Sequence, residues 1–103
     1  MIKVFSLIRR REDLTLDEFR TWALEEHAPK GRSLPGLRRY SMSVIEADDP
    51  DLPYHAVSEL YFDDEDAFKA AFASDAGRAA GADVAAHASS RVRLVTREEQ
   101  IIT

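Results

Sequence analysis

Four segments of the chain have the hydrophobic pattern of a β-strand, with frequent β-branched and aromatic residues and alternating apolar and polar positions. They cover residues 2–9, 37–47, 54–62 and 90–97. In the third segment one face holds four residues, Ala56, Ser58, Leu60 and Phe62. The other face holds Val57, Glu59 and Tyr61. We expect this second face to point away from the helices of the protein.

A capping box predicts the start of the first helix, because Thr15 is followed by Glu18 three residues later. The apolar stripe of this helix has spacings of three and four residues, typical of one helix face. It consists of Leu16, Phe19, Ala23 and His27. Proline disfavours helical backbone in the residue before it. We therefore expect the helix to end at Pro29.

A second helical region follows the third strand. Asp63 or Asp64 is suited to cap it, and acidic residues in its first turn suit the helix dipole. Its apolar stripe consists of Phe68, Ala71 and Phe72. A break at residues 74–77 is expected to start a second helical piece that runs to about residue 87. That piece carries Ala76, Ala80, Val84 and His87 on one side.

The order β-α-β-β-α-β predicts a single α+β domain, residues 1–103, with a ferredoxin-like fold. Four antiparallel strands form the sheet, strands one and three are central, and both helical regions cover one face. The opposite face stays bare, and we assign to it Tyr40, Met42, Val57 and Tyr61. These side chains are too apolar to be left in water. A homodimer is therefore expected, with Ile101 and Ile102 reaching toward the partner.

Composition narrows the classes of function. Asp and Glu outnumber Lys and Arg by 19 to 14, for a net charge of −5, which argues against binding nucleic acid or an anionic membrane. The chain has no cysteine, so thiolate ligands are excluded. It has neither a His-x-x-x-His pair nor a glycine-rich phosphate loop. We expect a cytoplasmic protein without metal, flavin or haem.

Several motifs resemble the EthD-type branch of the dimeric α+β barrel superfamily. They lie at residues 1–4, 16–22, 26–29, 34–40, 59–63 and 72–77. The most specific pieces are His27-Ala28-Pro29 and Pro35-Gly36-Leu37. The resemblance implies a homodimer in which two sheets form a barrel. It also implies a small-molecule cavity in each subunit, between the sheet and the helices.

The chain is also similar to the methylmuconolactone isomerases, which share the helix-end histidine, the Pro-Gly-Leu turn and the tyrosine after it. In this sequence these residues are His27 and Tyr40. A histidine in the region of His55 is implied as well. Fungal relatives are dehydratases or decarboxylases of polyketides, so the resemblance alone does not define the reaction.

His27, Tyr40 and His55 are the candidate catalytic residues. The unperturbed pKa of histidine lies near neutral pH, which suits His27 to general acid–base catalysis. The structural alternative is a half-buried histidine that hydrogen-bonds the last carbonyls of its helix. Tyr40 is either a core aromatic residue or a hydroxyl that points into the cavity. His55 is expected at a solvated strand end, on the same face as Glu59.

Trp22, Met42, Glu59 and Tyr61 are the candidate substrate-binding residues. Trp22 is also suited to simple packing. Glu59 lies in the middle of a strand where burial is expected, so its carboxylate must be paired or neutral. We expect an ion pair with Arg39, Arg91 or Arg93.

Three functions are consistent with these residues. The first is a cofactor-free isomerase, cyclase or dehydratase that acts on lactone-like or aromatic compounds through positioned acid–base groups in a dry cavity. The second is a cofactor-independent or haem-using monooxygenase, as in sister branches of the superfamily. The third is a non-catalytic protein, a small-molecule-binding or stress-response dimer, which the absence of a polar pair in the cavity would favour.

Overall fold

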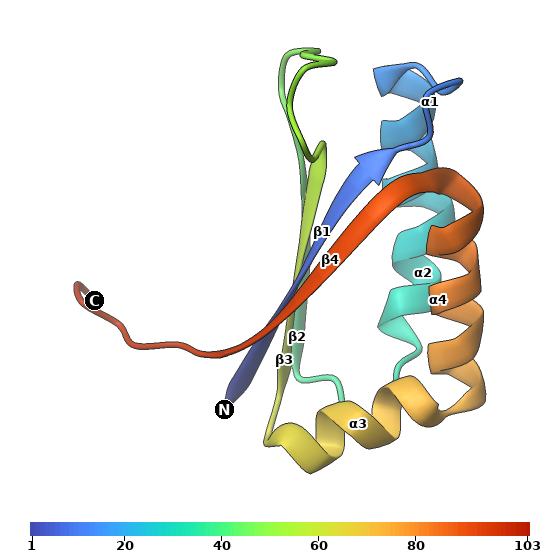
Figure 1. Ribbon diagram of the computed structural model, residues 1–103. Helices are drawn as coiled ribbons and strands as arrows, with labels where there is room; N and C mark the ends of the chain where they lie inside the picture. Colours follow the sequence, from blue (N-terminus) through green and yellow to red (C-terminus); the bar gives the residue numbers. More distant parts are fainter.

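The computed structural model describes all residues, 1–103, and has the expected order of strands and helices (Figure 1). Its elements are β1 (Ile2–Arg10), α1 (Leu16–Thr21), η1 (Trp22–His27), α2 (Ala28–Arg32), β2 (Arg39–Val44), β3 (Ala56–Phe62), α3 (Glu65–Ala73), α4 (Asp75–His87) and β4 (Ala88–Arg97). The capping box of Thr15 and Glu18 is formed. Asp64 caps α3 and Ser74 caps α4.

The four strands form one antiparallel sheet in the order β2-β3-β1-β4, so the first and third strands are central, as predicted. All helices cover the same face of this sheet, and the residues after β4 extend away on the opposite side (Figure 1). The ferredoxin-like α+β fold is therefore confirmed. None of the helices combines the length and the hydropathy that a membrane-spanning segment needs.

The register of β3 is the predicted one. Ala56, Ser58, Leu60 and Phe62 are buried under the helices, while the residues between them are only half-buried. Tyr40 pairs with Leu60 and Met42 pairs with Ser58, and residues paired across strands point to the same face. The assignment of Tyr40 and Met42 to the bare face is therefore wrong. Their side chains lie on the helix side of the sheet.

The first helix does not end at Pro29. It continues to Arg32 because the segment Trp22–His27 is a π-helix, and a new α-helical segment begins at Ala28. The backbone N–H of Ala28 donates to the carbonyl of Ala23, five residues earlier. Pro29 thus lies in the first turn of a helical segment, where the missing N–H of proline is tolerated.

The core consists of two clusters of buried side chains between the sheet and the helices. One contains Val4, Leu34, Leu60, Phe62, Phe68 and Ala71. The other contains Ile8, Phe19, Trp22, Ala23, Ala56 and Val84. Phe19 and Ala23 of the predicted stripe are fully buried. Because the two clusters are separate, the space between them is where a cavity can form.

The outer face of the sheet has no covering layer in the single chain. Val92 and Leu94 of β4 are 38% and 46% exposed, and they pair with Leu7 and Phe5 of β1 on this face. Ile101 and Ile102 in the C-terminal tail are almost completely exposed. Apolar residues therefore remain in contact with solvent on the side away from the helices.

Candidate active site

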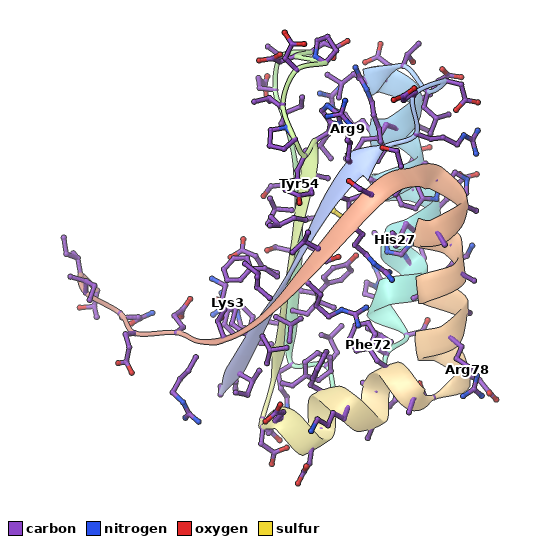
Figure 2. The ribbon with its side chains drawn as sticks, in the orientation of Figure 1. Lys3, Arg9, His27, Tyr54, Phe72 and Arg78 are labelled. Carbon is purple, nitrogen blue, oxygen red and sulfur yellow. The ribbon has the colours of Figure 1, made fainter.

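A cavity lies between the sheet and the helices, at the junction of the two core clusters. Its lining residues come from all four strands and from the helical layer: Ser6, His27, Gly31, Leu34, Tyr40, Ser58, Leu60, Phe72, Ala80, Gly81, Val84, Arg91 and Arg93. His27 and Phe72 both point into this space in Figure 2. The cavity thus brings together His27 and Tyr40, two of the predicted catalytic residues.

Asp83 of α4 orients the ring of His27. The His27 Nδ1 atom lies 2.9 Å from Oδ2 of Asp83, and both side chains are 8% exposed. The carboxylate is an acceptor only, so it holds the neutral ring with its proton on Nδ1. Nε2 makes no hydrogen bond within the chain, and it is not one of the enclosed unpaired atoms, which are Nη1 of Arg10 and Nε2 of His55. The lone pair of His27 Nε2 is therefore free to accept a proton from a bound molecule.

Trp22 contacts both members of the Asp83–His27 pair. Its indole Nε1 donates to the same Oδ2 atom of Asp83 over 3.2 Å, and its ring stacks on His27 with centroids 5.0 Å apart. The π-helix explains the stacking, because residues five apart become neighbours only when the helix is wound with i→i+5 hydrogen bonds. Trp22 does not line the cavity. Its contacts are with Asp83 and His27 instead.

His87 and Lys30 complete the network around Asp83. His87 is not a free surface residue, because it stacks on Trp22 at 4.7 Å and its Nδ1 lies 2.8 Å from the backbone carbonyl of Asp83. Lys30 Nζ lies 3.2 Å from Oδ1 of Asp83. No group of three His, Cys, Asp or Glu side chains is arranged to hold a metal ion.

The surroundings keep His27 neutral and Asp83 ionised near neutral pH. Burial lowers the pKa of His27 below its ordinary value, and the hydrogen bond and charge of Asp83 oppose this effect only in part. Burial alone would raise the pKa of Asp83. Hydrogen bonds from His27, Trp22 and Lys30 outweigh that effect, and the pKa of Asp83 is lowered. A neutral imidazole beside a fixed carboxylate is the protonation state of a general base.

Tyr40 reaches the cavity from β2 by packing on a glycine. A Cβ atom at Gly31 would lie 2.8 Å from the Tyr40 hydroxyl oxygen and 2.9 Å from two carbons of its ring. Only glycine in α2 therefore leaves room for this ring. Burial raises the pKa of Tyr40, and the Ser58 hydroxyl opposes the rise. The phenol is thus a hydrogen-bond donor at neutral pH.

His55 lies elsewhere and is not solvated. It is 1% exposed, its Nδ1 accepts the backbone N–H of Arg10 over 3.1 Å, and Nε2 has no partner. Its ring meets the edge of Phe19 in the helical layer, so the prediction of a solvated strand end on the face of Glu59 is wrong. The residue precedes β3, where strand alternation does not yet apply. His55 does not line the cavity of His27.

The remaining substrate-binding candidates also lie outside the cavity. Met42 accepts a contact from the Ser58 hydroxyl at 3.3 Å and packs against the second core cluster. Glu59 forms the expected ion pair, but its partner is Lys3 at 2.6 Å rather than an arginine. Tyr61 donates to Glu98 over 3.0 Å. Lys3, Glu59 and Tyr61 are on the outer face of the sheet, away from the cavity.

Asp83 is a residue of the candidate site that no sequence pattern identified, and Arg91 and Arg93 were expected only as partners for Glu59. Asp83 lies four residues before His87 in an alanine-rich helix, and an acid at this spacing is a signal for a local pair. Its main partner, however, is 56 positions away. Arg91 and Arg93 alternate with apolar residues in β4, which places both on one face.

Comparisons with known proteins agree with this fold. The model of the EthD domain family matches residues 11–90. An uncharacterised 11.0 kDa protein from the thcB–thcC intergenic region of Rhodococcus erythropolis is 31% identical over 78 residues, which is 75% of this chain and 76% of that protein. The crystal structure of an EthD family protein from Bacillus halodurans has a TM-score of 0.82 and 27% identity, and covers 96% of this chain and 99% of its own.

A more distant structure is that of SnoaB, a cofactor-independent oxygenase from Streptomyces nogalater. It has a TM-score of 0.69 and 16% identity, and the match covers 98% of this chain and 95% of that one. At this identity the likeness concerns the fold alone.

Proposed function

The chain belongs to the EthD family, and we propose that it is an enzyme that moves protons on a small carbonyl compound, with His27 as the general base. The observation that carries this proposal is the Asp83–His27 pair in the cavity, with Nε2 free and Tyr40 among the same lining residues. The free Nε2 atom argues against a purely structural histidine. The presence of this polar pair argues against a non-catalytic binder.

The proposed reaction begins when Nε2 takes a proton from the carbon next to a carbonyl group. Tyr40 donates a hydrogen bond to the enolate oxygen, where negative charge develops, and so lowers the barrier. The His27 imidazolium, stabilised by Asp83, then returns its proton. Return to a different carbon gives an isomerisation, and return to a leaving hydroxyl gives a dehydration. Neither step requires a metal, flavin or haem.

We also propose that the enzyme works as a homodimer. The supporting feature is the uncovered outer face of the sheet, where Leu94 and Val92 are partly exposed beside Lys3 and its two acidic partners. The C-terminal tail projects on this same side with Ile101 and Ile102 exposed (Figure 1). Light scattering should give twice the chain mass at micromolar concentration, and a monomer at high concentration would contradict the dimer.

Cofactor-independent oxygenation is the second candidate. The fold is shared with SnoaB and with an antibiotic biosynthesis monooxygenase at a TM-score of 0.71 and 19% identity. An oxygenase would use the same base to form a carbanion and would then consume oxygen. An oxygen electrode separates the two candidates, because proton transfer alone leaves the oxygen concentration unchanged.

The test of the proposed function is hydrogen–deuterium exchange at carbon. A panel of small ketones, keto acids and lactones is incubated in D2O with the protein, and loss of the α-proton signal is followed by NMR. We expect catalysed exchange for some members of the panel and none with Asp83→Asn, in which the amide no longer fixes the Nδ1 tautomer. Exchange that persists in the absence of both His27 and Asp83 would rule out this site.

A further inference from the structure

Two arginines without an acidic partner stand at the edge of the cavity. Arg91 and Arg93 line it, and strand pairing with Ile8 and Ser6 puts their side chains on the inner face of the sheet. Five other arginines pair with aspartates, among them Arg10 with Asp48 and Arg38 with Asp63, whereas four outside the cavity, Arg97 among them, form no salt bridge either. What sets Arg91 and Arg93 apart is that they line the cavity. Arg91 and Arg93 form no salt bridge and no side-chain hydrogen bond.

Arg93 is held in place by aromatic contacts rather than by an anion. Its guanidinium lies 4.2 Å from the ring centroid of Phe72 and 5.9 Å from that of Phe68. Stacking on a ring uses the face of the guanidinium, and its N–H groups along the edge remain free. Burial and the nearby charge of Arg91 lower the pKa of Arg93. Both arginine side chains are exposed to solvent where they reach the edge of the cavity. Two like charges side by side are unfavourable unless an anion joins them.

We propose that the substrate carries a carboxylate, which Arg91 and Arg93 bind at the β4 side of the cavity while its carbonyl end lies at His27 and Tyr40. This inference rests on the proposed function and adds the chemical class of the substrate. The guanidinium fork matches the two oxygens of a carboxylate. Much of the remaining wall is apolar, with Leu34, Leu60 and Val84, and suits the hydrocarbon part of such a compound.

We take the anion to be a carboxylate rather than a phosphate group, because one guanidinium fork satisfies both carboxylate oxygens, whereas the three oxygens of a phosphate monoester need donors on several sides. Charge does not decide between them, since the two arginines would also match a phosphate charge near −2. His27 is neutral there and Tyr40 is a single donor. Binding of phenyl phosphate that is tighter than binding of a matched carboxylate would overturn this choice.

The test compares phenylpyruvate with its neutral methyl ester, and follows binding by calorimetry and α-proton exchange in D2O by NMR as two separate readouts. For the wild-type protein we expect the acid to bind roughly 10- to 100-fold more tightly than the ester, the usual worth of hydrogen bonds to a charged group. Arg93→Gln should bring the two affinities together. Arg93→Lys, which keeps the charge without the fork, should retain part of the preference.

Arg97→Gln is the matched control, because Arg97 lies on the same strand, has no acidic partner and does not line the cavity. It should leave the acid-to-ester ratio unchanged. If Arg93 served only to pack on Phe72, Arg93→Gln would lower the melting temperature and change both affinities equally. That result, or wild-type protein that shows no preference for the acid, would overturn the inference.

The same experiment separates this inference from the proposed function. His27→Ala should abolish exchange but keep the preference for the acid over the ester. Exchange that survives in His27→Ala while the acid is still preferred would contradict the catalytic role of His27 and leave carboxylate binding by the arginines standing.

Discussion

His27 and His55 are both buried, yet their surroundings differ in the features that matter for chemistry. His27 hydrogen-bonds a carboxylate and leaves one ring nitrogen free at a cavity. His55 accepts a backbone N–H, and its free nitrogen is enclosed away from that cavity. Burial lowers the pKa of both residues. A lowered pKa alone therefore does not identify a catalytic histidine. His55 lines a separate polar hollow, so what distinguishes His27 is its carboxylate partner together with a ring nitrogen that is not enclosed.

Removal of the His27 side chain should have the largest effect on activity. We expect His27→Ala to lower turnover of an identified substrate by roughly 10²–10⁴-fold, the usual worth of general acid–base catalysis. The fold should survive with a loss of about 1–2 kcal/mol in the free energy of unfolding. Steady-state kinetics and urea unfolding measure the two effects. A variant that unfolds instead would assign His27 a structural role.

His55→Ala should lower stability more than His27→Ala does, and should lower turnover much less. The substitution leaves a hole beside Phe19 and an unpaired backbone N–H at Arg10, and we expect a loss of roughly 2–4 kcal/mol in the free energy of unfolding. Under conditions where the variant is folded, its turnover should stay within about twofold of wild type, because His55 touches neither the cavity nor Asp83. A loss of turnover equal to that of His27→Ala would remove the distinction between the two histidines.

Local patterns predicted most of the fold, and they predicted that His27 and Tyr40 border one cavity. The capping box at Thr15 and the stripes of both helical regions are short-range signals, and strand alternation identified the register of β3. His27 was found because it continues the stripe of its helix. Asp83 was missed because its contact with His27 joins two helices far apart in the sequence. The predicted helix end at Pro29 was wrong because a new α-helical segment begins at Ala28, directly after the π-helix. Pro29 therefore lies in the first turn of that segment, where proline is tolerated.

Gly31 and Gly81 test the shape of the cavity, since both line it but only one is in contact with Tyr40. Gly31→Ala would place a methyl group against the Tyr40 ring, and we expect a cost of about 1–3 kcal/mol together with reduced turnover. Gly81→Ala meets no atom within 4 Å and should stabilise α4 by up to about 1 kcal/mol. Thermal unfolding and kinetics of the pair provide the measurement. Equal effects at both glycines would show that Tyr40 is not held by Gly31.

The smallest expected effect is on the pH dependence of stability, to which both histidines contribute. Their pKa values in the folded protein lie below the ordinary 6.5. Below about pH 6.5 these histidines therefore bind more protons in the unfolded chain than in the folded chain. Stability should be greatest above that pH and should decline on acidification, until the pH passes the lowered pKa values. The slope is at most about 1.4 kcal/mol per pH unit for each histidine.

The charges around each ring modify this slope. Asp83 opposes the lowered pKa of His27, whereas Lys30 and His87 reinforce it. Arg10 and Arg9 reinforce the lowered pKa of His55. Urea unfolding at about pH 7.5 and pH 5.5 should therefore show a smaller difference in His55→Leu than in wild type, since the leucine cannot take up a proton in either state. An unchanged difference would mean that His55 is protonated equally in the folded and unfolded chains, and the acid sensitivity would then belong to the His27 site.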